Sequence, residues 1–536
     1  MKAFNNLFLI LRKAANGLAL PVLQHPGMFF TAVSLLLLPF LFNILCKVGL
    51  LSFVCHTSHI PWIGFSVFST TFVLAYVFCL LQRFLRIGKV FVVVIALLVT
   101  VDIFLTMTFG MGISQMSLQL LLQSNGGEAE EFLYTYVLKP SAVVLFLVVL
   151  AVCCVGLSGK ADARLRERMW ANRQTSSYII AALLVVPALA GCSKLRAAFR
   201  LLGTDDTYSL TLMIRQVPKD VVTKTVFAVK CVMAQRREVD TMLAVASRVR
   251  VDSCRFTSPE IIQVIGESFN KHHSSLYGYE ADTNPCLSAR RDNGGLFVFT
   301  DAVSPYNSTG EAMKSMLSST RARSGESWAE GPLLPTVFRK AGYRVALLDN
   351  QVVAKSDCTP WDYMLAFFMY EPTLMEASYD WCNSRTFPFD GQLVDVVRDS
   401  LLADGAQAMG GVMACKPTTG QNNFVVLHLM GQHVKYEARY PDEEQNHHVT
   451  ADDIRRPDLS AADRQVIADY DNATRYNDEV IDRLCSLYER RDAVLVYLSD
   501  HGDEVNDYRR HVGRSHQRPV TAGEAWTQYE IPMMIW

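Results

Sequence analysis

The sequence has no basic excess, no Cys-x-x-Cys pair and no long apolar run beyond about residue 195. Its 51 lysines and arginines balance 52 aspartates and glutamates, which leaves a formal net charge of -1. Surfaces that bind nucleic acid normally carry a basic excess, so this balance argues against a nucleic-acid partner. The missing Cys-x-x-Cys pair excludes the common cysteine-based metal and redox motifs.

The first two hundred residues are dominated by apolar runs, whereas the rest reads like an ordinary soluble protein. A bilayer core of about 30 Å needs roughly 20 apolar residues in a helix. Five stretches approach this length, and the fifth contains Pro187, which spanning helices tolerate. They are Met28–Cys46, Trp62–Leu81, Val90–Phe109, Val137–Leu157 and Tyr178–Cys192. Residues 1–195 are therefore predicted to form a transmembrane domain of five helices.

Positive charge predicts how these helices are oriented, because loops on the cytoplasmic side carry excess lysine and arginine. The N-terminal tail and the second and fourth loops are basic, while the third loop is acidic. The alternation places the N-terminus inside and everything after about residue 195 outside. The apolar runs are too long for a cleavable signal peptide, so none is expected. Residues 1–24 are compatible with an amphipathic helix on the inner surface or with a loosely ordered tail.

The outward part alternates strand-like apolar runs with helical segments. Residues 196–250 read as a connector on the membrane surface, and residues 251–536 as a globular domain. Short apolar runs between helices indicate an α/β fold around a mostly parallel sheet. The expected strands are Ile261–Ile265, Leu296–Phe299, Val345–Leu348, Phe424–Leu427 and Ala493–Leu498. Ligands of such sheets bind beyond the C-terminal ends of the strands.

Chemistry-bearing residues follow four of these strands. Glu267 follows the first and Asp500-His501 the last, while His428 and His433 follow the strand between them, and Ser308-Thr309 precede a helix. Each alone has an ordinary explanation, as a helix cap, a turn or a surface charge. Together, carboxylates and imidazoles at one sheet edge suit a divalent transition metal, and zinc accepts this mixture.

At these residues the sequence resembles the membrane-bound phosphoethanolamine transferases of Gram-negative bacteria, in the alkaline phosphatase and sulfatase superfamily. The resemblance covers the whole chain. It is carried by Gly266-Glu267-Ser268 running on to Ser275-Leu276-Tyr277-Gly278-Tyr279, by the Asn307-Ser308-Thr309 loop, and by Ser499-Asp500-His501-Gly502. It implies a zinc-dependent inner-membrane enzyme with a periplasmic catalytic domain, phosphatidylethanolamine as donor and lipopolysaccharide as acceptor. The group includes the colistin-resistance enzymes, which links it to polymyxin resistance.

The resemblance also implies roles for individual residues. Glu267, Asp500 and His501 look like zinc ligands, and Thr309 like both the fourth ligand and the nucleophile. Metal coordination lowers the pKa of a threonine hydroxyl and directs its oxygen at phosphorus. The predicted substrate-binding residues are His433, His516, Lys355, Asn350 and Glu128.

Some of these assignments leave alternatives. His511 and His516 both lie where the family has one histidine, and His516 is favoured by its distance from Ile531-Pro532. In the third loop, Asn125 and Glu128 resemble residues near the donor headgroup. The segment around Glu267 is closer to the heptose- and core-modifying branch than to the lipid A branch, so the acceptor stays open between core sugar and lipid A. The chain stops at Trp536 inside an apolar run, and a further C-terminal piece is expected.

Three other functions compete with this interpretation. A sulfatase-type hydrolase needs a Cys/Ser-x-Pro-x-Arg context, which the loop at Asn307–Ala312 lacks. A glycerol-phosphate transferase of the lipoteichoic acid synthase type shares the five-span plan and a zinc-bound threonine, and differs only in its donor. A non-catalytic envelope scaffold on the same fold has no need for a complete metal site.

Overall fold

A computed structural model describes residues 2–47, 60–109, 112–115, 117–118, 121, 133–214, 216–255, 258–322, 324–351, 367–369, 371–402, 422–443, 446–508, 510–514 and 520–536. The chain divides into two compact units, Met1–Gln235 and Arg236–Trp536. This division falls inside the segment predicted as a connector. The three-part division made from the sequence, with boundaries near residues 195 and 250, stays a prediction.

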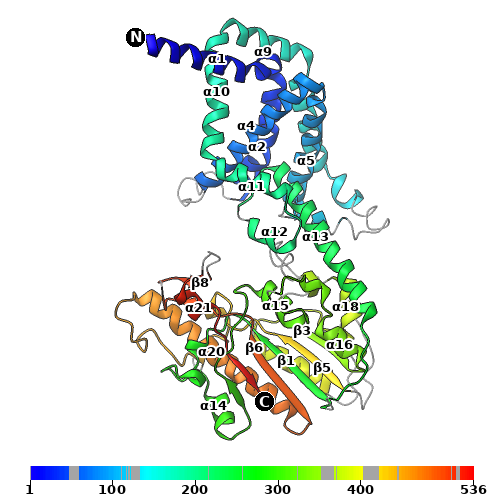
Figure 1. Cartoon of the computed structure of the whole chain (residues 1–536), viewed down its shortest axis with the longest axis vertical. Coiled ribbons are helices and arrows are strands. Elements are labelled where there is room, and N and C mark those ends of the chain that lie inside the picture. The colour runs from blue at the N-terminus through cyan, green and yellow to red at the C-terminus, as the bar shows by residue number, and fades with distance from the viewer. Residues whose placement is uncertain are drawn as a thin grey trace. The chain divides into compact units, whose positions relative to one another are not determined.

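The first unit is helical (Figure 1). Its helices are α1 (Lys2–Gln24), α2 (Pro26–Lys47), α4 (Ile60–Leu85), α5 (Gly88–Phe109), the π-helical turn η1 (Leu133–Val137), α8 (Pro140–Gly156), α9 (Gly159–Ala171), α10 (Arg173–Ala190), α11 (Cys192–Leu202), α12 (Thr207–Met213) and the first part of α13 (Val221–Arg248), which ends in the second unit. A helix lies at each of the five predicted apolar runs, and the N-terminal segment is helical as well.

Three helices of the described chain are long and apolar enough to cross a membrane: Val67–Leu85, Gly88–Phe109 and Arg173–Ala190. Two bent helix pairs pass the same test together, which gives up to five spans. The residue pattern of α5 shows why such a helix suits lipid. Val92, Ile95 and Val99 are buried at helical spacing, whereas Val90 and Leu97 are apolar and exposed on the other side. A helix that is apolar all round is typical of a membrane span.

The second unit is built on a seven-stranded sheet of order β2-β9-β6-β1-β5-β3-β4, in which β9 is antiparallel to its neighbours β6 and β2. Its strands are β1 (Glu260–Gly266), β2 (Phe297–Phe299), β3 (Arg344–Asp349), β4 (Trp381–Cys382), β5 (Asn423–His428), β6 (Ala493–Ser499) and β9 (Met533–Ile535), with β7 (Glu504–Val505) and β8 (Val512–Gly513) in a separate ribbon. All five expected strands are therefore present, and the predicted mostly parallel α/β fold is confirmed.

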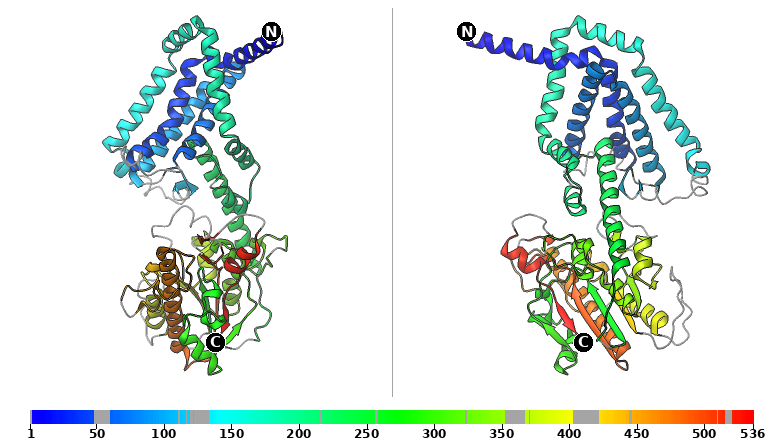
Figure 2. Two further views of the ribbon diagram at one scale, coloured as in Figure 1. Left: turned by 90° about the vertical axis from the view of Figure 1, so that its left-hand side faces the viewer. Right: turned by 45° about the vertical axis from the view of Figure 1, so that its right-hand side comes forward.

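Helices cover both faces of this sheet (Figure 2). The longer helices are α14 (Pro285–Asp292), α15 (Thr309–Leu317), α16 (Leu334–Lys340), α18 (Pro372–Ser378), α19 (Asp390–Val396), α20 (Ala461–Tyr488) and α21 (Ala522–Gln528). The short turns are η2 (Lys271–His273), η3 (Ser275–Tyr277), η4 (Trp328–Glu330), η5 (Phe367–Met369), η6 (Val397–Leu402) and η7 (Tyr436–Ala438).

Strand β1 lies at the centre of the sheet and explains its two cores. Side chains alternate across a strand, so successive residues of β1 enter opposite layers. Ile262 and Val264 pack with residues of α14, α19 and α20. Ile261 and Ile265 pack with residues of α15 and α18. A strand buried on both faces reads as a continuous apolar run, which is why this strand was visible in the sequence.

Candidate metal centre

Glu267, Asp500 and His501 meet at the C-terminal edge of the sheet. Strands β1 and β6 are neighbours in parallel register, with Gly266 opposite Ser499, so the residues that follow them emerge side by side. All three side chains are fully buried, and their ligand atoms lie within 4.8 Å of one another. His501 Nε2 lies 3.5 Å from Glu267 Oε1 and 2.9 Å from Asp500 Oδ2. The sequence-predicted cluster is therefore assembled by the fold.

The backbone around Glu267 turns sharply to present this carboxylate. Ser268 adopts a left-handed conformation with φ of 57°. Its N–H donates to Asp500 Oδ1 at 3.0 Å, and its hydroxyl donates to Glu267 Oε1 at 2.7 Å. A Cβ on Gly431 would lie 2.8 Å from the carbonyl oxygen of Glu267, so only glycine permits this close approach. Local backbone chemistry thus fixes Glu267 relative to Asp500.

The tautomer of His501 can be assigned from its partners. Its Nδ1 lies 2.9 Å from the carbonyl oxygen of Gly502, which can only accept a hydrogen bond, so Nδ1 carries the proton. Nε2 faces Asp500 Oδ2, an atom that accepts no hydrogen bond from the described residues, and the guanidinium of Arg514 contacts the same nitrogen. The donor set of carboxylate oxygens and imidazole nitrogen fits zinc.

Thr309 adds a hydroxyl to this cluster. It is the first residue of α15, and Ser308 before it occupies the N-cap position. Thr309 Oγ1 donates to Glu267 Oε2 at 3.0 Å and lies 3.3 Å from His501 Nε2. The residue is only partly buried. Of the Ser-Thr pair, Ser308 occupies the N-cap position, whereas the Thr309 hydroxyl contacts Glu267 and His501.

Positive charge surrounds the Glu267 carboxylate. Burial by itself would raise its pKa, yet the pKa of Glu267 is well below its ordinary value because His501, His433 and Arg514 lie nearby. On the other side of β1, burial would lower the pKa of the His428 imidazole. The carboxylates of Asp349, Glu267 and Asp500 outweigh that effect and raise the pKa to about 8. Positive neighbours therefore favour the ionised form of the Glu267 carboxylate.

Two of the predicted substrate-binding residues, His433 and Asn350, lie in the described part of the chain and have different surroundings. His433 is partly buried and close enough to Glu267 to lower its pKa, which is compatible with a role at the centre. Asn350 is fully buried, and its amide group donates to Asp390 and accepts from the N–H of Phe387. The polar atoms of Asn350 are thus engaged in hydrogen bonds inside the protein, and its role in substrate binding stays a prediction.

Several other predicted residues cannot be compared with the structure. Glu128, Asn125, Lys355 and His516 lie outside the described residues. The rival histidine, His511, is exposed, and its carbonyl accepts the N–H of Asn506. The choice between His511 and His516 stays a prediction.

Two residues at the centre escaped the sequence analysis. Gln351 donates to Glu267 Oε2 at 2.9 Å and to the carbonyl oxygen of Leu429 at 2.9 Å. It lies two residues after the end of β3 at Asp349, so inspection of the polar residues that follow each strand could have found it. Arg514 contacts His501 Nε2 and lies 3.9 Å from Glu267 Oε1. No motif marks Arg514, because it comes from an irregular segment.

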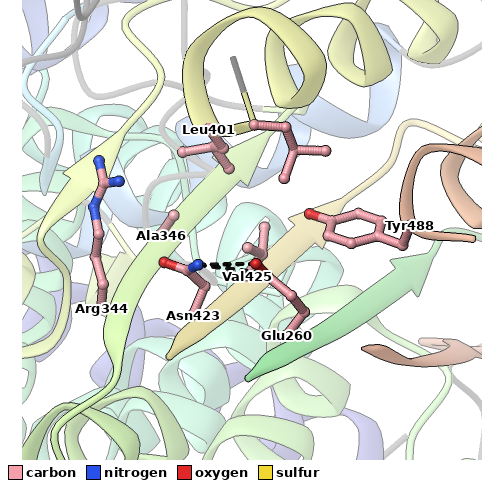
Figure 3. A pocket seen from close by; sticks show the side chains of 8 residues that line it. Glu260, Arg344, Ala346, Leu401, Asn423, Val425 and Tyr488 are labelled. Atoms are coloured by element: carbon pink, nitrogen blue, oxygen red, sulfur yellow. Dashed lines mark hydrogen bonds between the residues drawn. The ribbon is translucent and has the colours of Figure 1, made fainter. Parts of the chain in front are cut away.

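A separate pocket lies at the N-terminal ends of the central strands, away from the metal centre (Figure 3). It is lined by residues at the starts of β1, β3 and β5, among them Glu260, Arg344 and Asn423. The amide of Asn423 donates to Glu260 at 3.2 Å. Since ligands of parallel sheets bind beyond the other ends of the strands, this pocket is not the centre of the chemistry.

Comparison with known proteins identifies the family. Residues 259–536, more than half of the chain, match the family model described as Sulfatase. The chain belongs to the sulfatase family. Within it, the chain is similar to phosphoethanolamine transferase EptC of Escherichia coli K12, with 28% identity over 283 residues, covering 52% of this chain and 44% of the relative. It is equally similar to phosphoethanolamine transferase CptA of Salmonella typhimurium, with 28% identity over 281 residues and the same coverage. The predicted resemblance to phosphoethanolamine transferases is confirmed.

The matched part of the chain spans less than half of the length of these relatives. Solved structures include the C-terminal periplasmic domain of EptC from Escherichia coli in complex with Zn, with 26% identity, 52% of this chain and 73% of that chain covered, and a TM-score of 0.42. Integral membrane phosphoethanolamine transferase A of Neisseria meningitidis has 17% identity, covers 95% of this chain and 88% of its own, and has a TM-score of 0.41.

Proposed function

We propose that this protein transfers phosphoethanolamine from phosphatidylethanolamine to a lipopolysaccharide acceptor, either a core sugar or lipid A. The observation that carries the proposal is the position of Thr309 Oγ1, within 3.3 Å of both Glu267 and His501 in a buried cluster of metal-ligand type. The named relatives are phosphoethanolamine transferases, which supports the choice of the transferred group. The candidate spans support a lipid donor and a place in the inner membrane, with the second unit in the periplasm.

Glu267, Asp500, His501 and Thr309 would hold a zinc ion. When bound, zinc supplies positive charge that acidifies the threonine hydroxyl and stabilises the charge of the transferring phosphoryl group. Glu267 accepts a hydrogen bond from Thr309, which orients the oxygen and gives its proton an acceptor. Thr309 is the first residue of α15, so the positive end of the helix dipole favours negative charge on the same oxygen.

Transfer then takes two balanced displacements. Thr309 Oγ1 attacks phosphorus, the bond between phosphorus and the glycerol oxygen breaks, and diacylglycerol leaves with the proton that Thr309 loses. An acceptor hydroxyl or phosphate oxygen next attacks the phosphoethanolamine-threonine ester. The Thr309 oxygen leaves and regains a proton. His433 and Arg514, both near Glu267, would add positive charge opposite the phosphate oxygens.

The direct test measures diacylglycerol release from phosphatidylethanolamine by the purified full chain in detergent. We expect Thr309→Ala to reduce release by about 1,000-fold or more, since nucleophile removal leaves only binding and electrostatic effects. Thr309→Ser keeps the hydroxyl and serves as the matched control with measurable release. Release by Thr309→Ala at the parental rate would contradict the proposal.

Two rival functions give different results in the same assay. A glycerol-phosphate transferase would release diacylglycerol from phosphatidylglycerol and leave phosphatidylethanolamine intact. A non-catalytic scaffold would release it from neither lipid. Mass spectrometry of lipid A and core oligosaccharide from cells with and without the protein then identifies the acceptor.

A further inference from the structure

A buried histidine that takes no part in the proposed chemistry bridges two carboxylates. His273, 2% exposed, has Nδ1 at 2.7 Å from Asp471 Oδ1 and Nε2 at 3.0 Å from Asp507 Oδ1. Because an ionised carboxylate can only accept, both ring nitrogens carry protons and the ring is an imidazolium. Burial would lower the pKa of His273, but Asp507 and Asp471 outweigh it and raise the pKa to about 10.

The three partners come from different parts of the second unit. His273 lies in η2, on the segment that leaves β1 through Glu267. Asp507 lies on the segment that leaves β6 through Asp500 and His501. Asp471 belongs to α20, the long helix beside the sheet. His273 therefore joins the two ligand-bearing segments to each other and to a rigid helix.

The hydrogen-bond ladder of the sheet does not itself fix these segments. Pairing of β1 with β6 ends at Gly266 and Ser499, one residue before the predicted ligands. One further backbone bond, from the Asp500 N–H to the carbonyl oxygen of Gly266 at 2.9 Å, joins the two segments, and side chains add the contacts that follow. The Phe269 N–H donates to Ser499 Oγ at 3.0 Å. Asn270 Nδ2 donates to the carbonyl oxygen of Asp503 at 3.0 Å and to Asp507 Oδ2 at 3.2 Å. The contact of His273 with Asp507 is the last of these side-chain contacts between the two segments.

Two tyrosines seal the ion pairs from water. The Tyr279 hydroxyl donates to Asp471 Oδ2 at 2.9 Å, and its ring centroid lies 4.8 Å from that of His273. The Tyr470 ring packs edge-on at 5.0 Å, while its hydroxyl donates to the carbonyl oxygen of Ser268. A desolvated cation between two carboxylates holds its partners more tightly than an exposed one.

We propose that His273, bound between Asp471 and Asp507, is a positioning residue that sets the spacing of Glu267 from Asp500 and His501, and through it the zinc affinity of the centre. This inference rests on the proposed function, because it requires the centre to bind zinc. Outer partners of this kind typically change metal affinity by about 10- to 100-fold.

The test compares three variants of the full chain in detergent, after removal of metal with a chelator. Zinc is titrated against a competing chromophoric chelator, and thermal unfolding is recorded on the metal-free protein. His273→Gln removes the cation, and Asp507→Ala removes its partner on the β6 side. Asp478→Asn is the matched control: it is buried on the same helix α20, where it accepts the N–H groups of Cys286 and Leu287 and caps α14.

We expect His273→Gln and Asp507→Ala each to raise the zinc dissociation constant by about 10- to 100-fold. Asp478→Asn should lower the unfolding temperature yet keep the zinc dissociation constant within about threefold. If His273→Gln does not fold, Asp507→Ala alone decides. Parental zinc affinity in the variants would overturn the role of His273, and so would an equal loss in Asp478→Asn. A parent that binds no zinc would overturn the proposed function as well, which separates the two failures.

Discussion

The two units of this chain treat buried charge in opposite ways. In the first unit Asp102 is fully buried within α5, where Lys224 Nζ lies 2.7 Å and 2.8 Å from its two oxygens and the Ile113 N–H donates at 2.7 Å. The second unit gathers the carboxylates of Glu267 and Asp500 with the imidazole of His501 in one buried cluster, which Arg514 also contacts. A single ion pair is typical of structure, whereas a buried cluster of metal-ligand side chains is typical of a functional site.

The difference follows from what surrounds each unit. A helix in lipid must satisfy its polar groups internally, so a lone carboxylate needs a near and permanent partner. A parallel sheet brings the carboxyl ends of several strands to one edge, where polar side chains from distant parts of the sequence converge. Variants in either unit can therefore test whether buried charge serves structure in the first unit and metal binding in the second.

Removal of a ligand should have the largest effect. We expect Glu267→Ala to lower zinc affinity by more than about 100-fold, beyond the usual effect of an outer partner, and to abolish diacylglycerol release. The helical circular dichroism of the first unit should not change. Zinc titration and the release assay check this prediction, and a Glu267→Ala protein with parental zinc affinity would contradict the ligand assignment.

Breaking the pair in the first unit should act on stability alone. Asp102→Asn leaves the Lys224 cation without its carboxylate, and we expect a loss of about 2–3 kcal/mol. This is below the roughly 3–5 kcal/mol of a fully buried pair, because the Lys224 side chain is 23% exposed.

Thermal unfolding in detergent measures this loss. The double variant Asp102→Asn with Lys224→Met removes both charges and should recover part of the stability. Zinc affinity should stay at the parental value in both variants. A large change in zinc affinity would show that the Asp102–Lys224 pair also affects the metal centre, which would contradict its purely structural role.

The ion pairs of His273 with Asp471 and Asp507 predict a pH dependence of stability. The folded-state pKa of His273, about 10, lies above the ordinary value of 6.5, because Asp507 and Asp471 outweigh burial. Its contribution is therefore fully present below pH 6.5, declines as pH rises and is lost above about pH 10. The difference in unfolding temperature between parent and His273→Gln should be large at pH 6 and shrink toward pH 10. A difference that stays constant over this range would contradict an imidazolium at this position.

The smallest effect is expected at Gln351. Gln351→Leu removes one hydrogen bond to Glu267, so zinc affinity should fall by up to about tenfold. Asn350→Asp is the neighbouring control, since Asn350 contacts Asp390 and not the centre. We expect that control to lower the unfolding temperature by placing two buried carboxylates together. If Asn350→Asp changed zinc affinity more than Gln351→Leu, the role given to Gln351 at the centre would be wrong.

The sequence predicted those features that a regular period or a strand end produces. The continuous apolar run of β1 predicted a strand that ends just before Glu267, and the run of β6 predicted one that ends before Asp500 and His501; the structure has both strands and brings the three residues together. Periodicity cannot place residues from irregular segments. Arg514 reaches the centre from beyond β8, and no pattern links it to His501. Gln351 contacts Glu267 from two residues beyond β3, at a position that no motif of the sequence marks.

The role of Thr309 shows a different limit. A serine-threonine pair before a helix normally caps it, and only three-dimensional structure shows that Ser308 occupies the cap while Thr309 faces Glu267. The partners of His273 were invisible for a similar reason. Asp471 lies 198 residues from His273 in the sequence and Asp507 lies 234 residues from it, and no spacing rule connects them.

The central claim is that Thr309 is the residue that becomes covalently modified. Purified protein incubated with phosphatidylethanolamine without acceptor, quenched in acid and digested, provides the most direct test by peptide mass spectrometry. We expect one phosphoethanolamine group on the peptide that contains Thr309, and none on that peptide from the Thr309→Ala protein. An adduct on another residue, or diacylglycerol release with no adduct on Thr309 at any time, would contradict the account.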